Sequence, residues 1–140
     1  MARPTPYRLP WGMEPATGRP APDRRRALGA YGEQLAARYL QDQGMAVIDR
    51  NWRCARGEID LVARDGDCLV FCEVKTRRTS RFGSAVEAVD GRKAVRLRAL
   101  AAAWLQVHDV RAQRVRIDVI GILRPGAGPA RLCHLVGVGA

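Results

Sequence analysis

Two segments joined by Gly66-Asp67, one alternating and one largely apolar, constrain the fold of this chain more than any other feature. Residues 57–64, GEIDLVAR, have the period of two that is typical of a half-buried β-strand. Residues 68–76, CLVFCEVKT, have the composition of a buried strand. Gly-Asp between two such segments is typical of a two-residue turn with glycine in its first central position. The sequence therefore predicts a β-hairpin in which Asp65 pairs with Cys68.

The periodicity on either side of the hairpin predicts the remaining elements. Bulky residues recur at helical spacing ahead of Gly44, which stands where a helix would end: Leu28, Tyr31, Leu35 and Tyr39. Further strands are predicted at residues 45–52, 115–123 and 132–138, and a second helix from about Asp90. The order α-β-β-β-α-β, with one further strand, predicts an α/β domain whose mixed central sheet is flanked by helices.

Residues 1–26 differ in composition from the rest of the chain. They hold six of the eight prolines and the run Arg24-Arg25-Arg26, and they show no periodicity. Such a segment is typical of a flexible arm, which either keeps the protein soluble or contacts phosphates loosely. We therefore predict a flexible basic Pro/Arg-rich arm at residues 1–26, followed by one domain at residues 27–140.

The chain carries a large excess of positive charge. It has 24 Lys and Arg residues against 14 Asp and Glu residues, a formal net charge of +10. Such a balance favours nucleic acid or an anionic membrane surface as the partner. Aromatic residues make up only 6% of the chain, which argues against base stacking as the main mode of binding. We therefore expect contacts to the phosphates of nucleic acid.

No segment of the sequence would span a bilayer, because the longest uninterrupted apolar run, residues 99–105, is far too short. The N-terminus lacks the apolar stretch of a signal peptide. The four cysteines form no Cys-x-x-Cys pair and have no zinc-like spacing, which favours small core residues in a reducing compartment. These observations predict a cytoplasmic protein that does not bind membranes.

Acidic side chains are expected to meet on one face of the hairpin. With a two-residue turn, Asp60 lies opposite Glu73, with the two Cβ atoms about 5 Å apart. Glu58 then lies opposite Lys75 on the same face. Two carboxylates this close repel each other, and a divalent cation such as Mg²⁺ between them would remove the repulsion. A turn one residue longer would instead place Asp60 opposite Cys72.

The motifs around these residues resemble known families. Ile59-Asp60, followed by Glu73-Val74-Lys75 on the adjacent strand, resembles the PD-(D/E)xK signature of restriction-endonuclease-like nucleases, with isoleucine in the place of proline. Glu33, on the preceding helix, is similar to the additional acid of archaeal Holliday-junction resolvases. Five blocks in order, between about Leu28 and Leu123, more closely resemble the YraN-like family of uncharacterised bacterial proteins: GAYGEQLAARYL, NWRCARGEIDLVARDG, LVFCEVKTR, FGSAVEAV and RIDVIGI.

The resemblance implies a restriction-endonuclease-like αβββαβ core and a role for each matching position. Asp60 and Glu73 would bind Mg²⁺ or Mn²⁺ together with the backbone carbonyl of Val74. Lys75 would serve the attacking water, and Glu33 would support the metal site or bind a second ion. The implied reaction is the endonucleolytic hydrolysis of DNA phosphodiesters, with branched or damaged DNA as candidate substrates.

Basic residues that follow the hairpin are the expected contacts to the DNA backbone. They are Arg77, Arg78, Arg81, Arg92 and Lys93. A run of charges can also be a solvated face, and Lys93 could instead extend past the edge of the core into solvent. Cutting both strands of a junction would suggest a homodimer, a point that the sequence leaves open.

Two other functions fit the same residues. A nucleic-acid-binding module that retains the nuclease fold would use the basic residues without turnover. A protein-interaction subunit would use Asp60, Glu73 and Lys75 only as an ion-paired cluster that ties the hairpin together. Glu58 either pairs with Lys75 or faces solvent at the end of its strand.

Overall fold

The computed structural model describes residues 5–7, 24–78 and 91–138, and their secondary structure follows the predicted order. The elements are β1 (Thr5–Tyr7), α1 (Arg24–Asp42), β2 (Ala46–Cys54), β3 (Gly57–Asp65), β4 (Cys68–Arg77), α3 (Gly91–Val107), β5 (Arg114–Leu123) and β6 (Ala130–Leu135). The predicted α-β-β-β-α-β core with one further strand corresponds to α1 through β6 and is confirmed.

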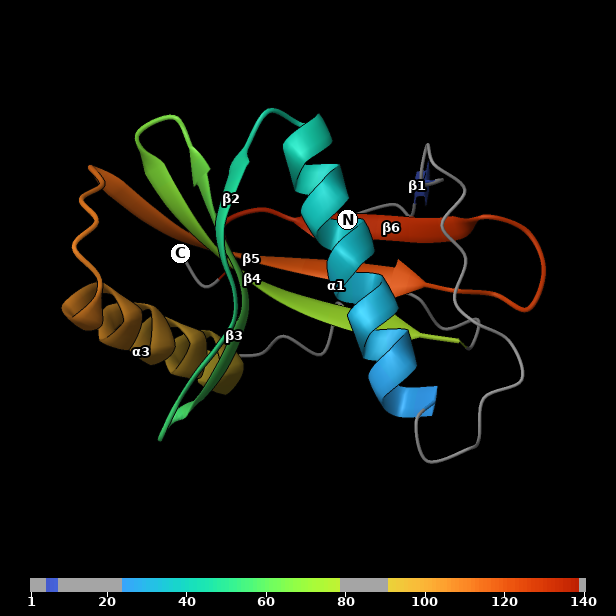
Figure 1. Ribbon diagram of the computed structural model, residues 1–140, viewed down its shortest axis with the longest axis horizontal. Helices are drawn as coiled ribbons and strands as arrows, with labels where there is room; N and C mark the ends of the chain where they lie inside the picture. Colours follow the sequence, from blue (N-terminus) through green and yellow to red (C-terminus); the bar gives the residue numbers. More distant parts are fainter. Residues whose placement is uncertain (1–4, 8–23, 79–90, 139–140) are drawn as a thin grey trace.

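The strands form one six-stranded mixed sheet in the order β1-β6-β5-β4-β3-β2. β4 and β5 pair in parallel, whereas the other neighbouring strands pair antiparallel. A parallel pair needs a long crossover connection, and α3 lies within it. α1 and α3 cover opposite faces of the sheet (Figure 1). The predicted mixed central sheet flanked by helices is therefore confirmed.

Each helix encloses a hydrophobic core against its own face of the sheet. Leu35 of α1 packs in one core with Val70 of β4, and Trp104 of α3 packs in the other core with Phe71 of β4. Successive residues of β4 thus alternate between the two cores, which explains why this strand is almost wholly apolar. Each large side chain that is fully buried in this way stabilises the fold by roughly 1.5–3 kcal/mol.

α1 approaches β4 most closely at Gly32. A Cβ atom at this position would lie 1.8 Å from Thr76 Oγ1 and 3.0 Å from Thr76 Cβ. Glycine is therefore required here because there is no room for a side chain, and not because of an unusual backbone angle. The next residue along the helix is Glu33, so this contact sets the position of Glu33 relative to the end of β4.

The structure differs from the prediction near the N-terminus. Thr5–Tyr7 form β1, which pairs antiparallel with residues 130–132 at the start of β6. This part of the predicted flexible arm therefore belongs to the sheet. α1 begins at Arg24, within the predicted arm and ahead of the expected start at Leu28. The prediction for the rest of the arm lies outside the described residues.

Two predictions about the chain as a whole can be compared with the structure. Among the described residues, no helix is long and apolar enough to cross a membrane. All four cysteines are free. Cys68, Cys72 and Cys133 are buried and Cys54 is partly buried, which agrees with their expected place in the core.

Candidate metal centre

The hairpin of β3 and β4 has the predicted turn but a shorter ladder than expected. The ladder begins with Asp65 opposite Cys68 and runs to Leu61 opposite Cys72. Gly66 has a φ of 61°, the positive value that glycine adopts without strain. The two-residue turn is therefore confirmed, and the alternative of a turn one residue longer is excluded.

The two strands part at Asp60, where the predicted acidic pair would have formed. The backbone N–H of Val74 donates a hydrogen bond of 2.7 Å to Asp60 Oδ2, so the side chain of Asp60 takes the place of a ladder contact. The predicted opposition of Asp60 and Glu73 is absent from the ladder of the described strands, and so is that of Glu58 and Lys75. The prediction that these four residues pair across the hairpin on one shared face is thus corrected.

The backbone of β2 and β3 is irregular at the same place. Ile59 packs in the core beneath α3 whereas Leu61 packs in the core beneath α1, although residues two apart share a face in a regular strand. On β2, Asn51 has a φ of 53°, in the left-handed region that residues other than glycine rarely adopt. The register of β2 and β3 places Asn51 beside Asp60. These irregularities in the backbones of β2 and β3 therefore coincide with the end of the regular ladder before Asp60.

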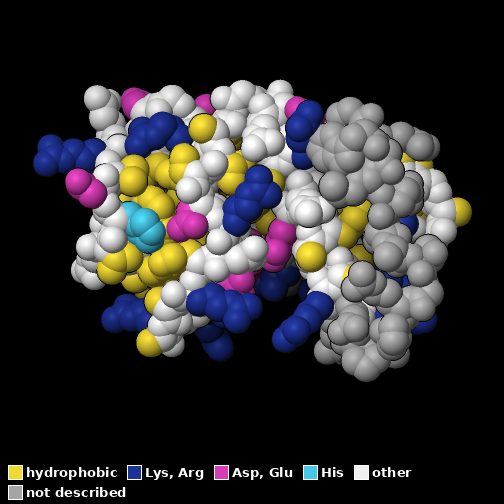
Figure 2. All heavy atoms as spheres, viewed as in Figure 1, with side chains coloured by type: hydrophobic (Ala, Val, Ile, Leu, Met, Phe, Trp, Pro, Cys, Tyr) yellow, Lys and Arg dark blue, Asp and Glu magenta, His cyan; other side chains and the backbone are white. Residues whose placement is uncertain are grey.

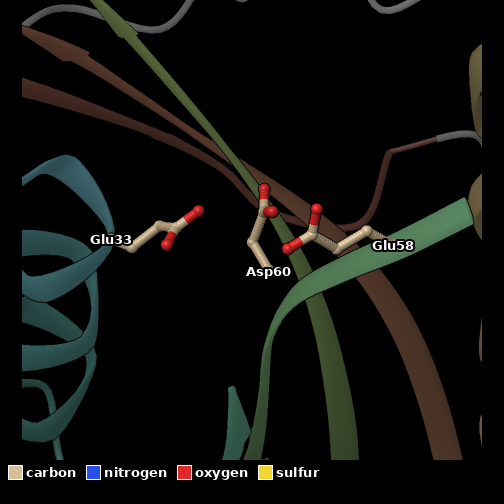
Figure 3. Close-up of side chains that lie close together, drawn as sticks. All are labelled: Glu33, Glu58 and Asp60. Atoms are coloured by element: carbon tan, nitrogen blue, oxygen red, sulfur yellow. The ribbon is translucent and has the colours of Figure 1, made fainter. Parts of the chain in front are cut away.

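Three carboxylates meet where the strands part. Glu33 of α1 and Glu58 and Asp60 of β3 bring oxygen atoms within 4.8 Å of one another. Figure 3 shows the side chain of Asp60 between the other two, with Glu33 extending toward it from α1. Hard divalent cations such as Mg²⁺ and Mn²⁺ prefer such carboxylate oxygens. These three residues therefore fit a divalent cation, and we refer to them as the carboxylate cluster.

The electrostatics of the carboxylate cluster also favour a cation. Burial, followed by the charges of Asp60 and Glu58, raises the pKa of Glu33 to about 7. Burial likewise raises the pKa of Asp60 to about 6, although the hydrogen bond from Val74 opposes this rise. Arg53 Nε lies 3.7 Å from Glu58 Oε2 at the exposed side of the cluster. A divalent cation would replace the proton that the raised pKa of Glu33 favours near neutral pH, and it would reduce the repulsion among the three carboxylates.

Glu73, the second predicted metal ligand, lies in a different group of side chains. Lys93 Nζ is 2.9 Å from Glu73 Oε2. Glu73 Oε1 lies 3.5 Å from Arg96 Nη2 and 3.9 Å from Lys75 Nζ. Its negative charge still contributes to the raised pKa of Asp60, so the two groups are neighbours. The structure thus places Asp60 and Glu73 in two different, neighbouring groups of side chains. We refer to the group of Glu73, Lys75, Lys93 and Arg96 as the cation cluster.

Lys75 is placed next to Glu73, as the motif suggested, and its environment changes its acidity. Burial lowers the pKa of Lys75, Glu73 opposes that effect, and the neighbouring Lys93 lowers the pKa again. A lysine with a lowered pKa is closer to the range in which it can accept a proton near neutral pH. The side chain is 30% exposed, so a substrate could reach it.

The residues predicted to bind DNA surround this region in part. Residues 74–78 of β4 and its end, with residues 28–29 of α1, line a cleft of about 570 Å³. Arg77 and Arg78 are exposed at this cleft, and Arg92 is exposed in the first turn of α3. Figure 2 shows acidic side chains near the middle of one face with Lys and Arg side chains on either side. Arg81 lies outside the described residues.

Reasoning from the sequence missed three residues of this region or gave them too small a role. The side chain of Asn51 hydrogen-bonds Glu33, and its signal was an asparagine inside a strand, because asparagine tolerates the left-handed region better than most residues. Glu58 was considered only for an ion pair or a strand end. Arg96 follows Lys93 by three residues, which places both on one face of α3.

Comparisons with known proteins give a consistent result. Residues 32–122 match the family described as Uncharacterised protein family UPF0102. A UPF0102 protein of Beutenbergia cavernae is 58% identical over 113 residues, which are 81% of this chain and 96% of that protein. One of Frankia alni is 59% identical over 111 residues, with coverages of 79% and 92%. One of Streptomyces griseus is 57% identical over 115 residues, with coverages of 81% and 97%.

Proposed function

The chain belongs to the uncharacterised protein family UPF0102, the YraN-like family that its motifs indicated, and we propose that it is a metal-dependent nuclease. The αβββαβ core and the order of Asp60, Glu73 and Lys75 along the hairpin support a place in the restriction-endonuclease-like superfamily. The proposed reaction is the endonucleolytic hydrolysis of phosphodiesters in DNA, with branched or damaged DNA as candidate substrates and the cytoplasm as its location.

The carboxylate cluster is the observation that carries this proposal. Glu33 comes from α1 and Glu58 and Asp60 come from β3, with β2 between them in the chain, and their oxygen atoms lie within 4.8 Å of one another. Acids held this close and partly buried destabilise the charged state of one another, as the raised pKa values of Glu33 and Asp60 indicate. A structural role alone would be served better by an acid beside a base. The cluster is therefore best explained as a cation site.

Each residue near the cluster has a place in such a reaction. Mg²⁺ or Mn²⁺ held by the three carboxylates would supply positive charge to a phosphoryl oxygen and acidity to a water molecule. The N–H of Val74 holds the carboxylate of Asp60 in one orientation. Whether the carbonyl of Val74 also serves as a ligand stays a prediction. Lys75, whose pKa is lowered, would accept or position a proton of the attacking water at Nζ.

Nucleic acid is the proposed substrate class because of the charge around the site. The chain has a net charge of +10, and Arg77 and Arg78 lie at the cleft that contains Lys75. Phosphate contacts by such side chains would give an affinity that falls steeply with salt. A homodimer would allow both strands of a junction to be cut, and this also stays a prediction.

One observation favours a second candidate function, a nucleic-acid-binding module that retains the nuclease fold without turnover. Glu73 is surrounded by Lys75, Lys93 and Arg96 and does not join the carboxylate cluster. If the chemistry required Glu73 beside Asp60 on one cation, this arrangement would be inactive. The binding module would keep salt-dependent DNA affinity and would show no requirement for metal.

The proposal is tested by combining metal binding with cleavage. Purified protein with Mg²⁺ or Mn²⁺ is expected to nick a panel of Holliday junctions, flaps and single strands. Asp60→Asn should lower Mn²⁺ affinity at least about tenfold and abolish cleavage, since it removes the central carboxylate. Lys75→Ala should abolish cleavage while Mn²⁺ affinity is nearly kept.

Asp67→Asn is the matched control, because Asp67 is an exposed acid in the hairpin turn that pairs with Arg114 at the other end of β4. It should cleave and bind Mn²⁺ as the wild type does. Equal traces of cleavage by the wild type and by Lys75→Ala would indicate a contaminating nuclease. DNA binding without any Mn²⁺ affinity would favour the non-catalytic module instead.

A further inference from the structure

The cation cluster is arranged differently from a simple ion pair. Among the described residues, the single carboxylate of Glu73 meets three cationic side chains. Lys93 lies closest, 2.9 Å from Oε2. The other oxygen, Oε1, is shared between Arg96 at 3.5 Å and Lys75 at 3.9 Å. These two distances exceed those of short charge-assisted hydrogen bonds, so Lys75 and Arg96 are held loosely by Glu73.

The exposure of these side chains shows which of them a ligand would meet first. The side chain of Glu73 is 11% exposed and that of Lys93 is 19% exposed. Lys75 is 30% exposed and Arg96 is 56% exposed. A ligand from solvent would thus meet the two loosely held cations before it reached the carboxylate. The chemical class that fits two adjacent, accessible cations is an anion, and a phosphate offers oxygen atoms to both.

We infer that Arg96 and Lys75 form a phosphate-binding site for a nucleic-acid backbone, in which Glu73 is the template that positions the cations and not a metal ligand. Lys93, on α3, forms an ion pair with the second oxygen of Glu73. The guanidinium of Arg96 presents a planar set of donors, which suits a phosphate diester better than an ammonium does. Arg96 is thus added to the residues that contact the substrate.

This inference deepens the proposed function, since it divides the site into two parts. The carboxylate cluster on the α1 side would take the cation, and the cation cluster on the α3 side would take a phosphate. Lys75 is the link between them, because it belongs to the cation cluster and its charge also lowers the pKa of Asp60. The phosphate site itself requires no metal, so it can be tested separately.

The test measures DNA binding in EDTA with a fluorescein-labelled duplex of 20 base pairs at several salt concentrations. Arg96→Gln should weaken binding and reduce the slope of log affinity against log salt by about one, the loss of one phosphate contact. Inorganic phosphate should compete less effectively with the variant than with the wild type. Arg96 is exposed, so the substitution should leave thermal unfolding unchanged.

Arg114→Gln is the control, because Arg114 is an exposed arginine paired with Asp67 at the opposite end of β4. It should leave the slope unchanged. A slope that changes equally in both variants, or in neither, would overturn the inference and leave only a general charge effect. The absence of any DNA or phosphate binding by the wild type would overturn it as well.

Glu73→Gln separates the inference from the proposed function. If Glu73 is a template, Mn²⁺ affinity should stay within about twofold of the wild type, whereas the loss of a metal ligand would lower it at least tenfold. A tenfold loss with unchanged unfolding would return Glu73 to the metal site and overturn its template role. Failure of the wild type to bind Mn²⁺ would instead overturn the proposed function. The phosphate site would then be tested by the DNA-binding measurements in EDTA alone.

Discussion

The backbone N–H of Val74 lies 2.7 Å from Asp60 Oδ2 and donates its hydrogen bond to a side chain at the point where a ladder bond would otherwise be expected. Asp60 therefore has a fixed orientation that does not depend on a cation. A site whose central ligand is held in advance loses less conformational freedom when it binds a metal ion. The same contact keeps β3 and β4 connected after their ladder ends.

Substitution of Gly32 tests the contact between α1 and β4. Gly32→Ala should lower the free energy of unfolding by about 1–3 kcal/mol, because the new Cβ would lie 1.8 Å from Thr76 Oγ1 and the helix must move. Urea unfolding measures this change. Since Glu33 follows directly, Mn²⁺ affinity should fall as well.

The control for Gly32 is Gly29 in the same helix. A Cβ at Gly29 would meet nothing within 4 Å, so Gly29→Ala should be neutral or stabilise the protein by up to about 1 kcal/mol. Thr76→Ala combined with Gly32→Ala should recover part of the loss. If Gly29→Ala and Gly32→Ala were equally stable, the close approach of α1 to β4 would be contradicted.

Asn51 can be tested by substitutions that separate its backbone from its side chain. Asn51→Gly keeps the φ of 53° without strain, so the free energy of unfolding should change by less than about 1 kcal/mol. The variant loses the hydrogen bond to Glu33, so Mn²⁺ affinity should fall by about three- to tenfold. Isothermal titration calorimetry and thermal unfolding measure the two effects.

A double-mutant cycle shows whether Asn51 acts through Glu33. In the background of Glu33→Gln, the change Asn51→Gly should make little further difference to Mn²⁺ affinity. Asn51→Val, with a β-branched side chain in the left-handed region, should instead destabilise the protein by on the order of 1–3 kcal/mol. Equal losses of affinity in both backgrounds would mean that the two residues act independently.

The stability of the metal-free protein should decrease between about pH 4.5 and pH 7. Burial raises the folded-state pKa of Glu33 to about 7 and that of Asp60 to about 6, so the folded protein holds more protons than the unfolded chain in this range. Stability must then fall as pH rises through these values. Asp118, whose pKa is lowered, acts with the opposite sign and only at more acidic pH.

Urea unfolding at a series of pH values measures this dependence. Glu33→Gln should flatten the curve between pH 5 and pH 7, because the glutamine does not titrate. Saturating Mg²⁺ should also flatten it if the carboxylate cluster binds the ion. A wild-type curve that rises through this range would show that the acids are already neutralised by other side chains.

Asp118 should be the most sensitive buried polar residue among those described. It is fully buried on β5, accepts hydrogen bonds from Arg116 and the N–H of Gly137, and lies 2.7 Å from His134 Nε2. Asp118→Ala should lower the free energy of unfolding by about 3–5 kcal/mol, because it leaves the cation of Arg116 partly buried without this partner. Asp67→Asn, at a solvent-exposed pair, should lower the free energy of unfolding far less than Asp118→Ala does.

The elements were predictable from the sequence because their signals are local. The period of two in GEIDLVAR and the Gly66-Asp67 turn predicted β3, β4 and the first pair of their ladder, all of which the structure confirms. The end of that ladder was not predictable in the same way. It coincides with the left-handed backbone of Asn51 in the neighbouring strand, which the pattern of the hairpin sequence does not reveal.

The site was predicted in part for the same reason. Glu33 and Asp60 were identified from a resemblance and lie together, whereas Glu73, which both the resemblance and the extended ladder placed beside Asp60, lies in the neighbouring cation cluster. Glu73 is paired there with Lys93 and Arg96, which come from a helix some twenty residues further along the chain. The pairing of β1 with β6 is likewise a contact between distant segments, which a three-residue strand in a proline-rich region does not reveal.

The contact of Gly32 with Thr76 has a consequence for a chain that is still being synthesised. Glu33 and Asp60 emerge from the ribosome before β4 is complete, but α1 finds its resting place against a residue near the end of that strand. A nascent chain that stops short of residue 76 would therefore carry all three acids without holding them together. On the proposed function, metal binding would therefore begin only when the hairpin has been made in full.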